Sequence, residues 1–168
     1  MGDNFMKSKV ICMICLALAG FSGTAGADIS TLAVFPFENN CGARKTQYED
    51  MGKSISVMLM TELSQTKSPF RLVDRDRIQT LIEELEFSRS AYVDQSTAIR
   101  MGKMLGARFI AFGSFMVIGR TLRIDARIIR VETGTLLFAE DVSGHREQVI
   151  PIVESLARKI AERGASLN

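Results

Sequence analysis

The clearest hydrophobic pattern covers residues 106–142, and it predicts three consecutive β-strands. The first, residues 108–117, is almost continuously apolar, which is typical of a central strand covered on both faces. The second, residues 122–128, alternates between apolar and polar side chains, as a strand with one less buried face does. A turn with Gly134 leads into the third strand, which starts at residue 136 and ends near residue 144.

Shorter patterns predict two more strands, at residues 31–37 and 69–73, and four helices. The helices are expected at residues 47–65, 75–87, 96–105 and 147–163, where apolar residues recur at helical spacing. Asp74 is expected to cap the second helix and Gly106 to end the third. The last helix is expected to bury Ile150, Val153, Leu156, Ala157 and Ile160. The order βαβαα-βββ-α predicts an α/β fold with a mixed β-sheet of about five strands flanked by helices.

Residues 1–27 have the pattern of a cleaved secretory signal peptide. Lys7 and Lys9 precede an apolar run, and the small residues 25–27 form a cleavage signal. The apolar run is shorter than the about 20 residues of a membrane-spanning helix, which would be the alternative. We therefore expect residues 28–168 to form one mature periplasmic domain.

The three cysteines bear on anchoring and on disulfides. Cys12 and Cys15 lie in the apolar run and do not follow the small residue that lipid attachment requires, so no lipid anchor is expected. Cys41 is then the one cysteine of the mature domain, which leaves no internal disulfide. Its thiol is either inert or, in an oxidising compartment, able to link two molecules. Removing residues 1–27 takes away Lys7, Lys9 and Asp3 and lowers the formal net charge from +2 to +1, which is too balanced for a dedicated nucleic-acid binder.

No group of residues in the sequence predicts catalysis. The single histidine, His145, cannot build a catalytic triad or a histidine-rich metal site and is expected at the surface. No glycine-rich phosphate loop is present. We predict no catalytic, metal or cofactor-binding residues and no small-molecule substrate.

Arginines in the second strand of the central stretch are the main candidates for protein contacts. Arg123 and Arg127 share one strand face, with Asp125 between them for partial neutralisation. This face is either solvated, covered by a helix, or a subunit contact, where arginine is favoured. The candidate interaction residues are Cys41, Tyr92, Arg123 and Arg127.

An ordered series of segments resembles the CsgG family, whose best-known member is the curli secretion channel of the bacterial outer membrane. The series is LAVFPFEN, LMTELSQT, FRLVDRDRIQTLIEELEF, GKMLGARFIAFGSF and LRIDARIIRVETGTLLFAE. The resemblance spans residues 32–161. It implies the fold of that family, which is similar to the fold of the periplasmic activator LpoB and of the amino-terminal domain of TolB.

The parts of the channel that cross the membrane have no counterpart in this sequence. The resemblance implies a long insert between the strands at 109–117 and 122–131, and a second after the strand at 136–142. Here Gly119 and Arg120 turn the chain at once, whereas each membrane strand needs about 9–11 residues. Residues 38–46, which match the constriction loop of the channel, lack its pore-lining aromatic residue.

The sequence therefore predicts a non-enzymatic periplasmic CsgG-like protein that acts by contacting envelope proteins. Its role would be assembly or transport in cell-envelope biogenesis or curli-type secretion, without insertion into the membrane. A homo-oligomer and a position peripheral to the outer membrane both fit this role. The alternative is an LpoB-like regulator that binds a peptidoglycan synthase.

Overall fold

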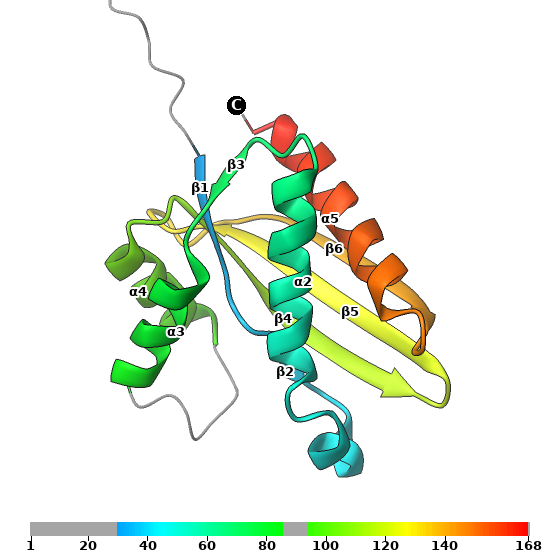
Figure 1. Cartoon of the computed structure of the whole chain (residues 1–168). Helices are drawn as coiled ribbons and strands as arrows, with labels where there is room; N and C mark the ends of the chain where they lie inside the picture. Colours follow the sequence, from blue (N-terminus) through cyan, green and yellow to red (C-terminus); the bar gives the residue numbers. More distant parts are fainter. Residues whose placement is uncertain (1–29, 86–93, 168) are drawn as a thin grey trace, which may run out of the picture.

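Among the described residues, six strands form one sheet, and the first of these strands lies in its interior. The computed structural model describes residues 30–85 and 94–167. The strand order is β3-β1-β4-β5-β6, and β2 also pairs with β4. The strands are β1 (Ser30–Val34), β2 (Glu38–Asn39), β3 (Phe70–Leu72), β4 (Phe109–Ile118), β5 (Thr121–Arg130) and β6 (Leu136–His145). Pairing is parallel from β3 through β1 to β4 and antiparallel from β4 to β6 (Figure 1). The predicted mixed sheet is confirmed, with β2 as a strand that the hydrophobic pattern missed.

Helices pack on both faces of this sheet. The helical segments are η1 (Gly42–Tyr48), α2 (Met51–Gln65), α3 (Arg75–Glu84), α4 (Gln95–Leu105) and α5 (Val149–Ala165). Figure 1 shows α2 and α5 side by side on one face, while α3 and α4 lie together at one end of the other face. The predicted α/β architecture is therefore confirmed.

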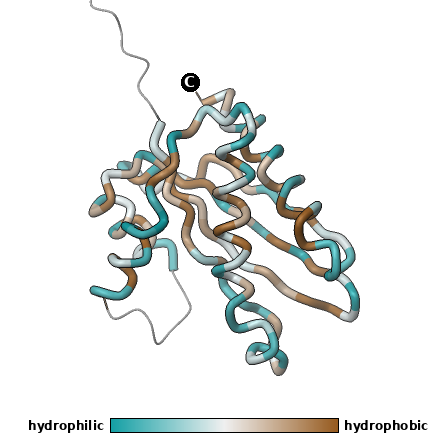
Figure 2. Tube along the Cα trace, viewed as in Figure 1, coloured by the Kyte–Doolittle hydropathy of each residue, from teal (hydrophilic) through white to brown (hydrophobic). Residues whose placement is uncertain are grey.

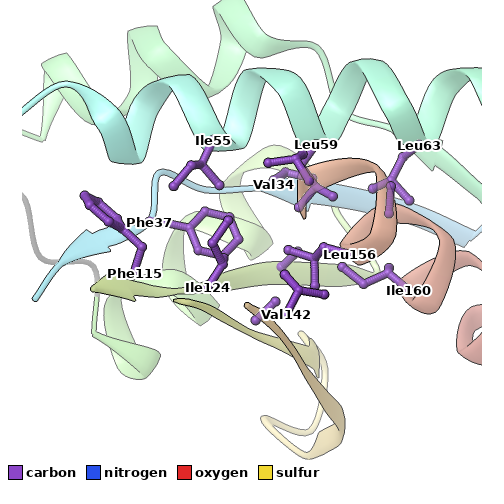
Figure 3. Packing of buried hydrophobic residues seen from close by; sticks show 14 of the residues in the cluster. Val34, Phe37, Ile55, Leu59, Leu63, Phe115, Ile124, Val142, Leu156 and Ile160 are labelled. Atoms are coloured by element: carbon purple, nitrogen blue, oxygen red, sulfur yellow. The ribbon is translucent and has the colours of Figure 1, made fainter. Parts of the chain in front are cut away.

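The two faces bury separate hydrophobic clusters. The larger cluster joins α2 and α5 to the sheet, and its fully buried side chains include Ile55, Leu59, Leu156 and Ile160 (Figure 3). The smaller cluster joins α3 and α4 to β1 and the start of β4. Figure 2 shows that hydrophobic positions run along the strands in the middle of the molecule. Each such side chain contributes about 1.5–3 kcal/mol on burial, so these clusters hold the layers together.

β4 is covered on both faces only in its first half. Its residues from Phe109 to Phe112 are all buried, but Ser114 and Met116 are half-buried and Ile118 is exposed. The expectation of a strand buried throughout is wrong for this second half. The reason is that α4 ends at Leu105 and the chain turns directly into β4, so α3 and α4 cover only one end of the strand.

Predicted caps and boundaries are partly correct. The Asp74 side chain accepts a hydrogen bond from the backbone N–H of Asp76, and Gly106 ends α4 with a φ of 66°, as predicted. α2 begins at Met51, later than expected, because the preceding residues form η1. Ile150 is 60% exposed, which contradicts its predicted burial; Ile152 faces the core in its place.

A buried asparagine side chain helps to hold the shape of the segment that was predicted as a polar loop. Asn39 Nδ2 donates hydrogen bonds of 2.9 Å to the backbone oxygens of Lys45 and Tyr48. Its Oδ1 accepts a 3.0 Å hydrogen bond from the backbone N–H of Cys41. η1 has no fully buried residue, so these bonds add to the partial packing of Tyr48 against the core in fixing the segment.

Candidate interaction surface

One part of the sheet has a face that no described helix covers. It consists of alternate residues from the second half of β4, from β5 and from β6, which the strand register places in neighbouring rows. We define this open face by Ser114, Met116, Ile118, Thr121, Arg123, Asp125, Arg127, Ala139, Asp141, Ser143 and His145. All of these residues are exposed or half-buried. The intervening residues of β5, such as Leu122 and Ile124, are fully buried on the opposite face.

Local sequence explains why this face is polar. A strand alternates its side chains between the two faces, so the apolar residues of β5 pack under α2 and α5 while its charged residues point away. The tight turn at Gly119, with a φ of 59°, sets the register between β4 and β5. Since α3 and α4 lie over the other end of the strands, the charged rows stay accessible.

Arg123 is the centre of a small ion-pair network on the open face. Its Nη2 lies 2.6 Å from Asp125 Oδ1, and its Nη1 lies 3.1 Å from Asp141 Oδ2. The register places Asp125 directly opposite Asp141, where two like charges would repel each other without a bridging cation. The hydrogen bond and the charge of Asp125, aided by the charge of Asp141, raise the pKa of Arg123 above its ordinary value. Arg123 is thus held in place beside two carboxylates.

Arg127 lies on the same face but takes no part in this network. It sits opposite Phe112 on β4 and Ala139 on β6, and its side chain is exposed. Among the described residues it has no ion pair or hydrogen bond through its side chain. The expected neutralisation by Asp125 therefore involves Arg123 and leaves the guanidinium of Arg127 available to a partner.

His145 closes the end of the open face. It is the last residue of β6, opposite Thr121, and it is partly accessible, as expected of a surface residue. Its Nε2 accepts a 2.9 Å hydrogen bond from Arg120 Nε, and its Nδ1 lies 3.8 Å from Glu147 Oε2. This arrangement joins the β4–β5 turn to the connection between β6 and α5, which is a structural role.

The other two predicted interaction residues do not join this surface. Cys41 is buried, with 9% exposure, in the cluster on the opposite face of the sheet. Its burial favours an inert packed thiol over a link between molecules, because disulfide exchange needs access to the sulfur. Tyr92 lies outside the described residues. The structure therefore brings together Arg123 and Arg127, and it adds Asp141, which the sequence pattern of β5 alone could not reveal.

The described part of the chain gives little support for a metal site or a catalytic pocket. No three His, Cys, Asp or Glu side chains of residues 30–85 and 94–167 are grouped to hold a metal ion. A small pocket between α2 and α3 has a mixed lining, in which the polar side chains are those of Lys53, Ser56, Arg75 and Gln79. The Ser56 hydroxyl donates a 2.8 Å hydrogen bond to the backbone oxygen of Lys53, so it is engaged in the helix.

Comparison with protein families identifies the group to which this protein belongs. The model of the family described as "Curli production assembly/transport component CsgG" matches residues 25–122, more than half of the chain. The chain belongs to the CsgG family. The matched residues end at Leu122, at the start of β5, so β6 and α5 lie beyond them. Membership associates the protein with the cell envelope, and the described role of the family, assembly and transport, is not a catalytic one. A search of curated proteins gave no match.

Several solved structures have a similar fold at low sequence identity. PelC from Paraburkholderia phytofirmans, a dodecamer, has a TM-score of 0.51 at 14% identity, covering 80% of this chain and 88% of that one. TolB from Acinetobacter baumannii has a TM-score of 0.50 at 11% identity, covering 81% of this chain and 28% of that one. The C-terminal domain of LpoB from Escherichia coli has a TM-score of 0.49 at 18% identity, covering 80% and 94%. These likenesses concern the fold alone, and they confirm the expected relation to TolB.

The positions of the two expected inserts hold short connections in this CsgG family member. Gly119 and Arg120 alone join β4 to β5, and residues 146–148 join β6 to α5. Over the described ranges, none of the helices has both the length and the apolar character needed to cross a membrane.

Proposed function

We propose that this CsgG family member is a non-enzymatic periplasmic module that contacts other envelope proteins during envelope assembly or curli-type export. The observation that carries the proposal is the family membership combined with the two-residue turn between β4 and β5. The scaffold of the family is kept, while the segment expected to reach the membrane is replaced by a tight turn. Such a protein acts through its surface.

The open face is the surface that we assign to this role. It carries charged side chains on a rigid three-stranded platform, with Arg123 fixed by two carboxylates and Arg127 exposed. Arginine on a rigid support suits contact with proteins because its planar donors can pair with carboxylates. The dodecamer of PelC, which shares the fold, supports self-association as a further part of the role.

Location and processing are tested first. The mature protein is expected in the periplasmic fraction. Its measured intact mass should equal that of a chain that begins at Asp28. A pool released from membranes only by detergent, or retention of residues 1–27, would contradict a processed periplasmic module.

Partner capture tests the role itself. The protein, crosslinked in cells and purified from envelope extract, should recover envelope assembly or export components. Replacing Arg127 with Glu should reduce this recovery, while Arg158→Glu, an exposed change on α5, should not. Specific recovery of a peptidoglycan synthase would instead favour the LpoB-like alternative, and hydrolase activity lost on a single substitution would overturn the non-enzymatic assignment.

A further inference from the structure

The chain leaves the sheet toward opposite faces after two neighbouring strands. β3, β1 and β4 are parallel, so their carboxyl ends lie at the same edge of the sheet. The chain that follows β1 leads to α2 on one face, whereas the chain that follows β3 leads directly to α3 on the other face (Figure 1). In open α/β sheets such a reversal leaves a crevice between the diverging segments, and ligands are commonly bound there. The pocket between α2 and α3 is this crevice, because Val34 at the end of β1 is one of its lining residues.

The crevice is small and largely apolar inside. It is lined by the buried side chains of Val34 and Ile78 and by four half-buried apolar residues, Pro36, Val57, Met60 and Ile82. Its volume is about 30 Å³. One water molecule needs about 10–15 Å³, so the hollow admits a single short apolar side chain. It is far below the about 300 Å³ at which sites for small-molecule ligands begin.

Lys53 on α2 and Arg75 on α3 add two positive charges to the lining. Both side chains are exposed, and neither forms an ion pair with another described residue. No described aspartate or glutamate lines the crevice. Asp76 of α3 lines a different hollow that α3 forms with α4, and Glu83 accepts a 2.7 Å hydrogen bond from Gln79 Nε2. The crevice is therefore complementary to a negatively charged partner.

We propose that this crevice binds an acidic segment of a partner protein. One short apolar side chain of the segment enters the hollow, and neighbouring carboxylates pair with Lys53 and Arg75. The planar guanidinium of Arg75 can hold a carboxylate through two parallel hydrogen bonds, while Lys53 supplies a mobile point charge. This inference rests on the proposed protein-contact role and adds a contact that is separate from the open face.

The size of the crevice sets the expected strength of binding. An exposed ion pair strengthens binding by up to about fivefold, and this contribution falls with added salt. Burial of one valine side chain contributes more, at least about tenfold. Binding should therefore be reversible, with the apolar side chain as the main source of affinity and the two cations as the source of selectivity for acidic segments.

Short peptides with blocked ends test this chemistry on the isotope-labelled mature chain. In two-dimensional NMR, the peptide EEVEE should give saturable shifts of the backbone amides near Lys53, Val57 and Ile78. EEGEE, which lacks the apolar side chain, should bind at least about tenfold more weakly. KKVKK, which keeps the valine and reverses the charge, should not bind. Added salt should weaken the binding of EEVEE.

Charge reversal on the protein locates the site. Lys53→Glu combined with Arg75→Glu should weaken the binding of EEVEE at least about tenfold, because two attractions become repulsions. Arg158→Glu, an exposed change of the same kind on α5, is the matched control, and it should leave binding unchanged. Circular dichroism confirms that each variant is folded, as the exposure of all three positions leads us to expect. Absence of saturable binding, equal binding of KKVKK, or shifts centred on the open face would overturn the crevice as the site.

The outcomes separate this inference from the proposed function. If EEVEE does not bind to a chain that still recovers envelope components by crosslinking, the crevice contact is wrong and the proposed function stands. If the peptide binds in the crevice of a chain that recovers no envelope protein, the contact stands and the proposed function is wrong.

Discussion

Gly52 allows α2 to approach the segment after β1, and replacing it with alanine tests that packing directly. A Cβ at this position would overlap the backbone oxygen of Phe37 and lie 3.4 Å from Cε1 of the buried Phe115. The Phe37 backbone N–H also donates a 3.2 Å hydrogen bond to the Gly52 oxygen. Because the obstructing atom belongs to the backbone, it cannot move aside as a flexible side chain would.

The expected cost combines three terms. Alanine favours the helix over glycine by about 0.5–1 kcal/mol. Overpacking of a close contact costs about 1–3 kcal/mol, and a buried N–H at Phe37 that loses its partner costs about 1–3 kcal/mol more. The net result is a loss of about 2–4 kcal/mol in the free energy of unfolding for Gly52→Ala.

Urea denaturation followed by circular dichroism measures this loss. Lys53→Ala, the next residue along the same helix, is exposed and should change the free energy of unfolding by no more than about 0.5 kcal/mol. If Gly52→Ala is as stable as the wild type or more stable, the close approach of α2 to Phe37 is wrong and the helix-propensity gain dominates.

Substitutions at three further positions test other features. Asp94→Ala removes the N-cap of α4 and should lower the midpoint of thermal unfolding, whereas Asp94→Asn should keep the cap at neutral pH. The hydrogen bond from the Thr97 backbone N–H lowers the pKa of Asp94 below its ordinary value of 3.8. The ionised Asp94 therefore stabilises the fold fully above pH 3.8, and this stabilisation is lost as the pH falls through the lowered pKa. Asp94→Asn should lack this acid-dependent loss. Asn39→Asp removes two donors to backbone oxygens and should destabilise by about 2–4 kcal/mol, with faster hydrogen exchange in η1. Lys159→Ala frees the Asp141 backbone oxygen, to which Lys159 donates a 2.7 Å hydrogen bond, and should increase aggregation through the edge of β6, measured by light scattering.

Each of these tests has a contradicting result. If the wild type and Asp94→Asn lose stability equally as the pH falls, the Asp94 carboxylate is not the source of the acid-dependent loss. Unchanged exchange in η1 on Asn39→Asp would show that another contact holds the segment. Equal aggregation of Lys159→Ala and the neighbouring exposed variant Arg158→Ala would mean that the β6 edge is protected by other means.

Much of the fold could be predicted from the sequence because its elements are long and regular. β4 and β5 have ten residues each and α2 has fifteen, so the apolar run, the alternation and the helical spacing are long enough to recognise in the sequence. Short elements carried no such signal. β2 has two residues, and η1 buries none, so their positions depend on Asn39 and on contacts from distant segments.

Only part of the interaction surface could be predicted from the sequence, for a similar reason. Period-2 spacing placed Arg123 and Arg127 on one face, and the structure agrees. The pairing of Arg123 with Asp141 depends on the register between β5 and β6, which includes a bulge after Ile128. Exposure of the end of β4 likewise depends on where α4 stops, and Ile150 is exposed because it lies on the solvent side of α5, while Val149 and Ile152 face the core.

The interior position of β1 has a consequence for how this molecule forms during biosynthesis. β1 leaves the ribosome before any other described strand, yet its two neighbours are β3 and β4, the second of which begins at Phe109. Bringing β1 and β4 together closes a long loop, and the chain entropy lost in this step is not offset until the two strands pair. The hairpins of β4, β5 and β6, in contrast, join residues close in sequence. We expect the carboxy-terminal meander to nucleate folding and the leading strand to be captured last, which would keep the nascent chain open until most of it has been synthesised.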